Sequence, residues 1–168
     1  MILPWHQKDW ERIAGTIDTI HHGILLQGFP GTGLREFSIA LCRILLCESP
    51  HNHSGKWCDE CQSCRLFSAG SHPDFHLLCS ERESVESRLE LITAYSNRYQ
   101  DARERDRKTR PGRVIPVDQV RALGSRLSTH SHIASRRIVL IIPADRMNLN
   151  AANALLKLLE EPPSGTVI

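Results

Sequence analysis

A glycine-rich turn at residues 28–33, with the sequence GFPGTG, follows a short apolar run at 24–26 and precedes a helical pattern at 37–46. A strand, a glycine turn and a helix in this order are the context of a phosphate-binding loop of the type G-x-x-x-x-G-K-S/T. In such a loop, backbone N–H groups surround phosphate oxygens, the lysine neutralises the β and γ phosphates, and the hydroxyl holds Mg²⁺. The turn therefore has the frame of a phosphate-binding loop.

The side chains required for that chemistry are absent from the turn. Leu34 stands at the lysine position and Arg35 at the hydroxyl position, so neither a phosphate-neutralising amine nor a metal-binding hydroxyl is supplied. Tight turns of any kind favour glycine. The loop alone is therefore compatible with two interpretations, a nucleotide site that has lost its function or an ordinary turn. The degenerate loop comprises Gly28, Gly31, Thr32, Gly33, Leu34 and Arg35.

Helical and strand patterns alternate along the rest of the chain. The run at 137–142 is apolar almost throughout, which is typical of a parallel strand buried on both faces. The alternation predicts an α/β fold with a doubly wound parallel sheet, in which ligands bind at the carboxyl ends of the strands. Helices are expected over 5–20, 37–46, about 120–130 and 150–160, and strands over 24–26, 137–142 and 166–168, with a turn that enters a further short strand within 72–78.

The length, composition and charge of the chain exclude some classes of protein. The chain has 168 residues, 40% of them hydrophobic, which suits one ordinary globular domain with a small insertion. Neither a bilayer-spanning apolar run nor a leader sequence is evident, so we expect a cytoplasmic protein with no membrane partner. The formal net charge of +2 argues against a protein that mainly coats nucleic acid.

Four of the six cysteines form a C-x10-C-x2-C-x2-C pattern. Four thiolates at this density match a closed tetrahedral zinc site, because a C-x2-C pair directs two sulfurs of one turn at the same ion. A closed site leaves no coordination position for substrate, so the predicted Zn²⁺ is structural rather than catalytic. The predicted ligands are Cys47, Cys58, Cys61 and Cys64, within a zinc-binding module over residues 47–64.

Other interpretations of the cysteines stay open. Four unrelated thiols or a redox C-x-x-C pair are possible, and His51 or His53 could replace Cys47 as the fourth ligand. The two remaining cysteines, Cys42 and Cys79, are expected to be buried structural residues.

Residues 80–113 differ in character from the segments around them. They carry many charges, one possible helix near 85–95 and a highly charged run at 101–110 without apolar periodicity. Such a run is usually a solvated loop, so we expect an exposed, mobile insertion over 80–113. A basic loop that contacts DNA is the alternative.

The carboxylates of a P-loop ATPase are also missing. A catalytic Asp-Glu pair would follow the strand at 137–142, but this position holds Ile142 and Pro143. The next acid, Asp145, is expected to cap the following helix. The phosphate lysine, the metal hydroxyl and the catalytic acids are thus all absent, which favours a fold that kept its frame after losing hydrolysis.

The helix over 150–160 ends in two acids, Glu160 and Glu161, followed by Pro162 and Pro163. Acids at a helix C-terminus oppose the macrodipole by about 0.3–1 kcal/mol each when exposed. A solvated surface explains them most simply, although a role outside helix stability would also retain them.

The run NALLKLLEEPP at 153–163 resembles the signature of bacterial clamp-loader subunits of the AAA+ class. Together with the glycine turn, the four-cysteine segment and His72-Pro73-Asp74, the chain resembles the delta prime family of these subunits. In that family the P-loop is altered and ATP is not hydrolysed, whereas gamma and tau subunits keep the lysine, the hydroxyl and the Asp-Glu pair. This chain resembles the non-hydrolysing delta prime subunits at the corresponding positions, which hold Leu34, Arg35, Ile142 and Pro143.

The resemblance implies an AAA+, P-loop NTPase-like domain over residues 1–168, as the N-terminal part of a longer subunit with a sensor strand, lid and collar. Such a subunit acts as a stator in the DNA polymerase III complex that loads the sliding clamp onto primed DNA. It implies gamma, tau and delta subunits as partners, no catalytic residues and no requirement for ATP hydrolysis. The rival functions are an active ATPase that uses Arg35 and Asp145, and a zinc-bearing DNA-binding module. The interface candidates are Asn153, Lys157, Glu160 and Glu161.

Overall fold

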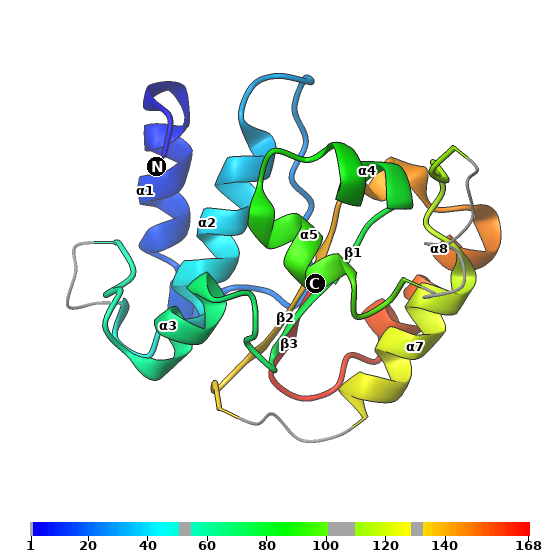
Figure 1. The fold of residues 1–168 in the computed structure, drawn as a ribbon. Helices are drawn as coiled ribbons and strands as arrows, with labels where there is room; N and C mark the ends of the chain where they lie inside the picture. The colour runs from blue at the N-terminus through cyan, green and yellow to red at the C-terminus, as the bar shows by residue number, and fades with distance from the viewer. Residues whose placement is uncertain (1, 51–54, 101–109, 129–132) are drawn as a thin grey trace.

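The computed structural model describes residues 2–50, 55–100, 110–128 and 133–168. Helices and strands alternate along the chain around a small parallel sheet (Figure 1). The elements are η1 (Pro4–His6), α1 (Gln7–Ala14), η2 (Ile17–Thr19), α2 (Leu34–Leu46), α3 (Gln62–Ser68), β1 (Phe75–Leu78), α4 (Glu81–Glu86), α5 (Glu90–Ser96), α7 (Val117–Leu127), β2 (Arg137–Ile141), η4 (Ala144–Arg146), α8 (Leu149–Glu160) and β3 (Thr166–Val167). In these described residues, no helix combines the length and apolar character needed to cross a bilayer.

The described strands form one parallel sheet in the order β1-β2-β3. This arrangement confirms the predicted parallel sheet. The strand expected at 24–26 is not assigned in the structure. Among the residues that the structure describes, two backbone hydrogen bonds tie this segment to the sheet beside β3: the Ile168 N–H donates to the His22 carbonyl at 2.6 Å, and the Ile24 N–H donates to the Ile168 carbonyl at 2.8 Å. The pairing is too short to build a regular strand, and Leu25 remains 74% exposed.

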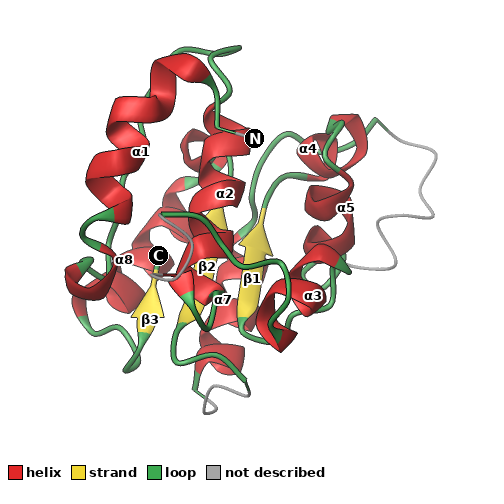
Figure 2. Cartoon of the chain, turned by 90° about the vertical axis from the view of Figure 1, so that its left-hand side faces the viewer, coloured by secondary structure: helices red, strands yellow, loops and turns green. Residues whose placement is uncertain are grey.

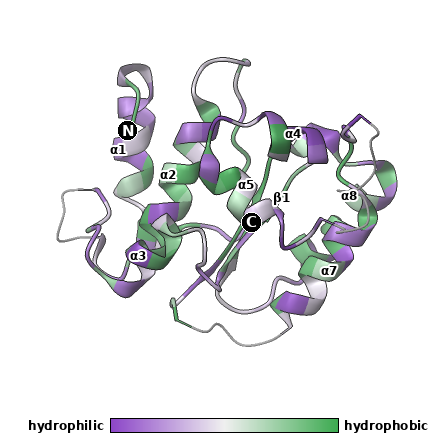
Figure 3. Cartoon of the chain, viewed as in Figure 1, coloured by the Kyte–Doolittle hydropathy of each residue, from purple (hydrophilic) through white to green (hydrophobic). Residues whose placement is uncertain are grey.

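Helices cover both faces of the sheet, which Figure 2 shows nearly face-on with α2 in front and α7 behind. One hydrophobic cluster joins β1 and β2 to α1, α2 and α5, and a second joins them to α7 and α8. Successive β2 residues alternate between the clusters, because Ile138 packs into the first and Val139 into the second. Hydrophobic and hydrophilic residues also alternate along α7 and α8 in Figure 3. The central strand is therefore buried on both faces, as predicted.

The opening segment forms shorter helices than expected. The predicted helix over 5–20 is divided into η1, α1 and η2, with Trp10 and Ile17 buried. Gly15 and Thr16 separate α1 from η2, and glycine is a weak helix former because of its backbone entropy. Conversely, α2 begins at Leu34, earlier than the apolar pattern that starts at Phe37.

The segment expected to be an exposed insertion is ordered over much of its length. Two helices, α4 and α5, replace the single helix predicted near 85–95, and α5 packs on β1. The Tyr95 ring lies 4.6 Å from the Phe75 ring centroid, and its hydroxyl accepts a hydrogen bond from the His72 N–H at 3.0 Å. The expectation that this segment is exposed was wrong, because its few apolar residues are buried although most of the surrounding residues are charged or polar. The charged run at 101–109 lies outside the described residues.

Candidate metal centre and degenerate phosphate loop

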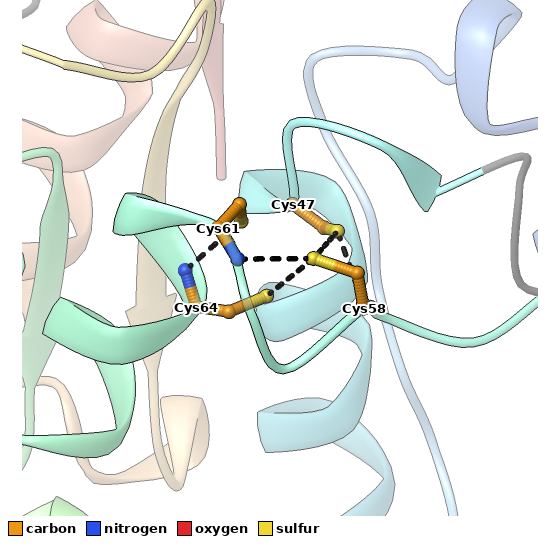
Figure 4. Close-up of side chains that lie close together, drawn as sticks. All are labelled: Cys47, Cys58, Cys61 and Cys64. Carbon is orange, nitrogen blue, oxygen red and sulfur yellow. Dashed lines mark hydrogen bonds between the residues drawn. The ribbon is translucent and has the colours of Figure 1, made fainter.

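The four predicted cysteine ligands come together at the junction of α2 and α3 (Figure 4). Cys47 directly follows α2, while Cys61 caps the N-terminus of α3 and Cys64 lies in its first turn. All four Sγ atoms lie within 4.8 Å of one another, with Cys58 Sγ at 3.6 Å from Cys47 Sγ and 4.0 Å from Cys64 Sγ. In a tetrahedral zinc site with Zn–S bonds of about 2.3 Å, any two ligand sulfurs are about 3.8 Å apart. The donor set therefore fits Zn²⁺.

Backbone N–H groups support negative charge on these sulfurs. The Cys61 N–H donates to Cys58 Sγ at 3.3 Å, and this bond contributes most to lowering the pKa of Cys58 to about 6. Burial instead raises the pKa of Cys47 and of Cys64. A bound dication would stabilise all four thiolates and reverse the effect of burial. The alternative ligands His51 and His53 lie outside the described residues.

The other two cysteines are separate from this cluster. Cys42 is buried in α2 and Cys79 follows β1, with exposures of 5% and 1%. Burial raises the pKa of each thiol to about 12. Their thiols remain protonated at neutral pH, so the expectation of buried structural cysteines is confirmed.

The glycine turn leads directly into α2 through residues with left-handed backbone geometry. Gly31 and Gly33 have φ values of 85° and 82°, in the left-handed region that favours glycine. A Cβ on Gly33 would lie 2.1 Å from Leu3 Cδ1, so the loop also approaches the N-terminal segment closely. The Trp5 indole donates to the Thr32 carbonyl at 2.8 Å. The loop is thus contacted by η1 and by the residue that precedes it.

The two replaced loop residues have structural contacts. Leu34 lies beside Gly28: if residue 28 carried a Cβ atom, that atom would lie 3.6 Å from Leu34 Cδ2. Arg35 forms a two-pronged ion pair with Glu83 of α4, from Nε to Oε1 at 2.5 Å and from Nη2 to Oε2 at 2.9 Å. The hydrogen bond with Glu83 is the main cause of a raised pKa of Arg35. Arg35 therefore binds a carboxylate of its own chain, a contact that the sequence pattern does not indicate.

The position of the catalytic acids contains no carboxylate. Ile142 is buried and its N–H donates to the Leu78 carbonyl at 3.0 Å. Asp145 lies in η4 with its side chain 76% exposed, 3.9 Å from Arg146. The expectation that Asp145 caps α8 is wrong, because Asn148 Oδ1 accepts the Ala151 N–H at 2.8 Å. Asn148 directly precedes the helix and so reaches the free N–H groups of its first turn.

The interface candidates lie on the exposed side of α8. Asn153, Lys157 and Glu160 are exposed at spacings of four and three residues, which places them on one helix face, and Glu161 is exposed at the helix end. Asn153 and Lys157 also line an open groove of about 460 Å³ between α7 and α8. Within the described ranges, Glu160 and Glu161 take part in none of the recorded ion pairs. The acids are therefore accessible to another molecule.

By its fold and site, this protein belongs to the class of parallel α/β domains that combine a phosphate-loop frame with a cysteine centre. The family described as "DNA polymerase III, delta subunit" matches residues 7–168, and the chain belongs to that family. It is 33% identical to DNA polymerase III subunit delta' of Escherichia coli over 97% of this chain and 40% of the relative. It is 35% identical to the Pseudomonas aeruginosa protein of the same name, over 99% of this chain and 42% of the relative.

The chain spans about two fifths of the length of these curated relatives. A solved structure of a DNA polymerase III gamma subunit-related protein from Thermotoga maritima is 30% identical. The match covers 56% of this chain and 32% of that chain, with a TM-score of 0.33.

Proposed function

We propose that this chain is an AAA+-type domain of a clamp-loader subunit that serves as a stator and does not hydrolyse ATP. The subunit would work in the cytoplasm with gamma or tau and delta subunits, which together load the sliding clamp onto primed DNA. Residues 47–64 would form a module with one structural Zn²⁺, held by the four cysteines. Family membership and relatives named DNA polymerase III subunit delta' support this assignment.

The observation that carries the proposal is the loss of three separate parts of the ATPase mechanism. Leu34 supplies no cation to phosphate, and Arg35 supplies no hydroxyl to Mg²⁺ and is bound to Glu83. Ile142 and Pro143 supply no carboxylate. Phosphoryl transfer depends on placing phosphate, metal and water together, so these losses act on the same step. An active site built from Arg35 and Asp145 lacks support because the guanidinium of Arg35 is held by both carboxylate oxygens of Glu83.

Restoring the loop alone is expected to leave ATP turnover at background. Leu34→Lys with Arg35→Thr returns the cation and the hydroxyl, yet the acids are still missing at Ile142 and Pro143. Steady-state phosphate release should be measured for the parent and the double variant, alone and mixed with clamp-loader subunits. The full-length protein is the material for this assay, and an active gamma subunit is the positive control. Substantial turnover by the parent alone would overturn the proposed lack of hydrolysis.

Glu160→Ala with Glu161→Ala is expected to weaken assembly with a gamma-type subunit without destabilising the domain. Removing acids from the C-terminus of α8 relieves an unfavourable dipole interaction of about 0.3–1 kcal/mol each, so thermal stability should be unchanged or slightly raised. Assembly is measured by size-exclusion chromatography, and DNA-stimulated ATPase by phosphate release from the assembled complex. Asp9→Ala with Glu11→Ala, which removes two exposed acids from α1, is the matched control. Parent-like assembly of the α8 variant would mean that these acids are ordinary surface.

A further inference from the structure

We propose that Arg43 is a positioning residue for the cysteine centre, because its guanidinium joins the segments that carry the four sulfurs. The inference rests on the proposed zinc site. Arg43 lies in the last turn of α2, which leads directly to Cys47. Its side chain is only 21% exposed and reaches across to the loop and helix that carry the other three cysteines.

The contacts of Arg43 fall on both sides of Cys58. The guanidinium lies over the indole of Trp57, 4.8 Å from the ring centroid, and Nη2 pairs with the carboxylate of Asp59. Trp57 and Asp59 are the immediate neighbours of Cys58 in sequence. One planar cation therefore fixes the direction in which the chain enters and leaves this ligand.

A third contact reaches the helix that carries Cys64. Arg43 Nη2 donates to Ser68 Oγ at 2.6 Å, and Ser68 Oγ donates to the Cys64 carbonyl at 2.9 Å. The guanidinium is thus linked through hydrogen bonds to the backbone of a second ligand. Together with Cys47 at the end of α2, these contacts connect the separate ligand-bearing segments.

The loop between Cys58 and Cys61 bends sharply at Asp59, the residue that Arg43 contacts. Asp59 has a φ of 62°, a left-handed conformation that few residues other than glycine adopt and that aspartate tolerates better than most. This bend allows the Cys61 N–H to donate to Cys58 Sγ at 3.3 Å. An exposed ion pair alone contributes about 0–1 kcal/mol, and Asp59 is 64% exposed. The effect of Arg43 on the centre therefore comes from joining several segments at once rather than from one charge pair.

Arg43→Gln is expected to bind Zn²⁺ about 10–100-fold more weakly, the usual range for losing a group that orients metal ligands. Arg43→Lys should fall between the parent and Arg43→Gln, because it keeps the charge but loses the planar fork. Arg65→Gln is the matched control, since exposed Arg65 is adjacent to Cys64 on α3. Affinity is measured by competition for Zn²⁺ with a colorimetric chelator, and content by elemental analysis of the full-length protein.

The outcomes separate this inference from the metal centre itself. If every variant contains zinc, and Arg43→Gln binds Zn²⁺ as tightly as Arg65→Gln does, the proposed role of Arg43 is overturned. The metal centre itself would then still stand. A parent without zinc would overturn the centre. If circular dichroism shows that Arg43→Gln does not fold, Arg43→Lys and Asp59→Asn decide the matter. Parent-like affinity in both would refute the positioning role, and weaker affinity in both would support it.

Discussion

Replacing Cys61 and Cys64 together by serine is expected to abolish binding of one Zn²⁺ per chain and to lower the free energy of unfolding by several kcal/mol. Structural zinc binds reduced peptides with an apparent ~10–16 kcal/mol, and this free energy is coupled to folding. Here the ion would hold the end of α2 against α3, where the four sulfurs already lie within 4.8 Å of one another. Elemental analysis gives the zinc content, and denaturant unfolding gives the change in stability.

Cys42→Ala and Cys79→Ala are the matched controls for this experiment. Both thiols are buried away from the proposed centre, so each variant should retain one zinc per chain even where it is less stable. Unchanged zinc in the Cys61→Ser, Cys64→Ser protein would contradict the ligand assignment. Absence of zinc from parent protein purified without chelator would contradict the metal centre as a whole.

Acidification from pH 6.5 to 4 is expected to destabilise the parent by about 3 kcal/mol more than a His76→Gln variant. Burial, reinforced by the positive charges of Arg98 and Arg126, lowers the pKa of His76 to about 4. The unfolded histidine has a pKa of about 6.5, so in this interval the unfolded chain binds more protons than the folded chain. The contribution of neutral His76 is complete above pH 6.5 and is lost as the pH falls through 4.

The measurement is the free energy of unfolding at a series of pH values, compared by slope rather than by absolute stability. His76 Nδ1 lies 2.6 Å from the Tyr99 hydroxyl, so His76→Gln also changes a buried hydrogen bond at every pH. His72 stays in both proteins, and burial lowers its pKa too, so the variant keeps some acid sensitivity. Equal slopes for parent and His76→Gln would show that His76 is not the group responsible.

Local patterns predicted much of this structure because they reflect burial directly. The continuous apolar run at 137–142 became the central strand, and the close cysteine spacing became a cluster of four sulfurs. The helix over 150–160 was predicted nearly to its boundaries, since α8 spans Leu149–Glu160. In each of these segments, the residues that decide the structure are close together in sequence.

Contacts between distant residues could not be predicted in this way. Arg35 and Glu83 are 48 residues apart, and nothing in either local sequence identifies the other as its partner. The packed side of α5 was also missed, because Ile92 and Tyr95 lie in a short segment between two highly charged stretches. Asp145 was a plausible cap by residue type, but Asn148 lies at the helix boundary. Tertiary packing decides each of these cases.

The hydrogen bonds between Ile168 and residues 22–24 have a consequence for folding during synthesis. They join segments separated by nearly the whole chain, and such non-local parallel pairings form slowly. At ribosomal rates of about 5–20 residues per second, the segment before the glycine turn waits roughly 7–30 seconds for its partner to be made. During this interval the apolar run at 24–26 has no neighbouring strand on the β3 side. The pairing of residues 22–24 with Ile168 can therefore form only after residue 168 has been made, whereas the glycine turn can already contact the nearby N-terminal residues Leu3 and Trp5.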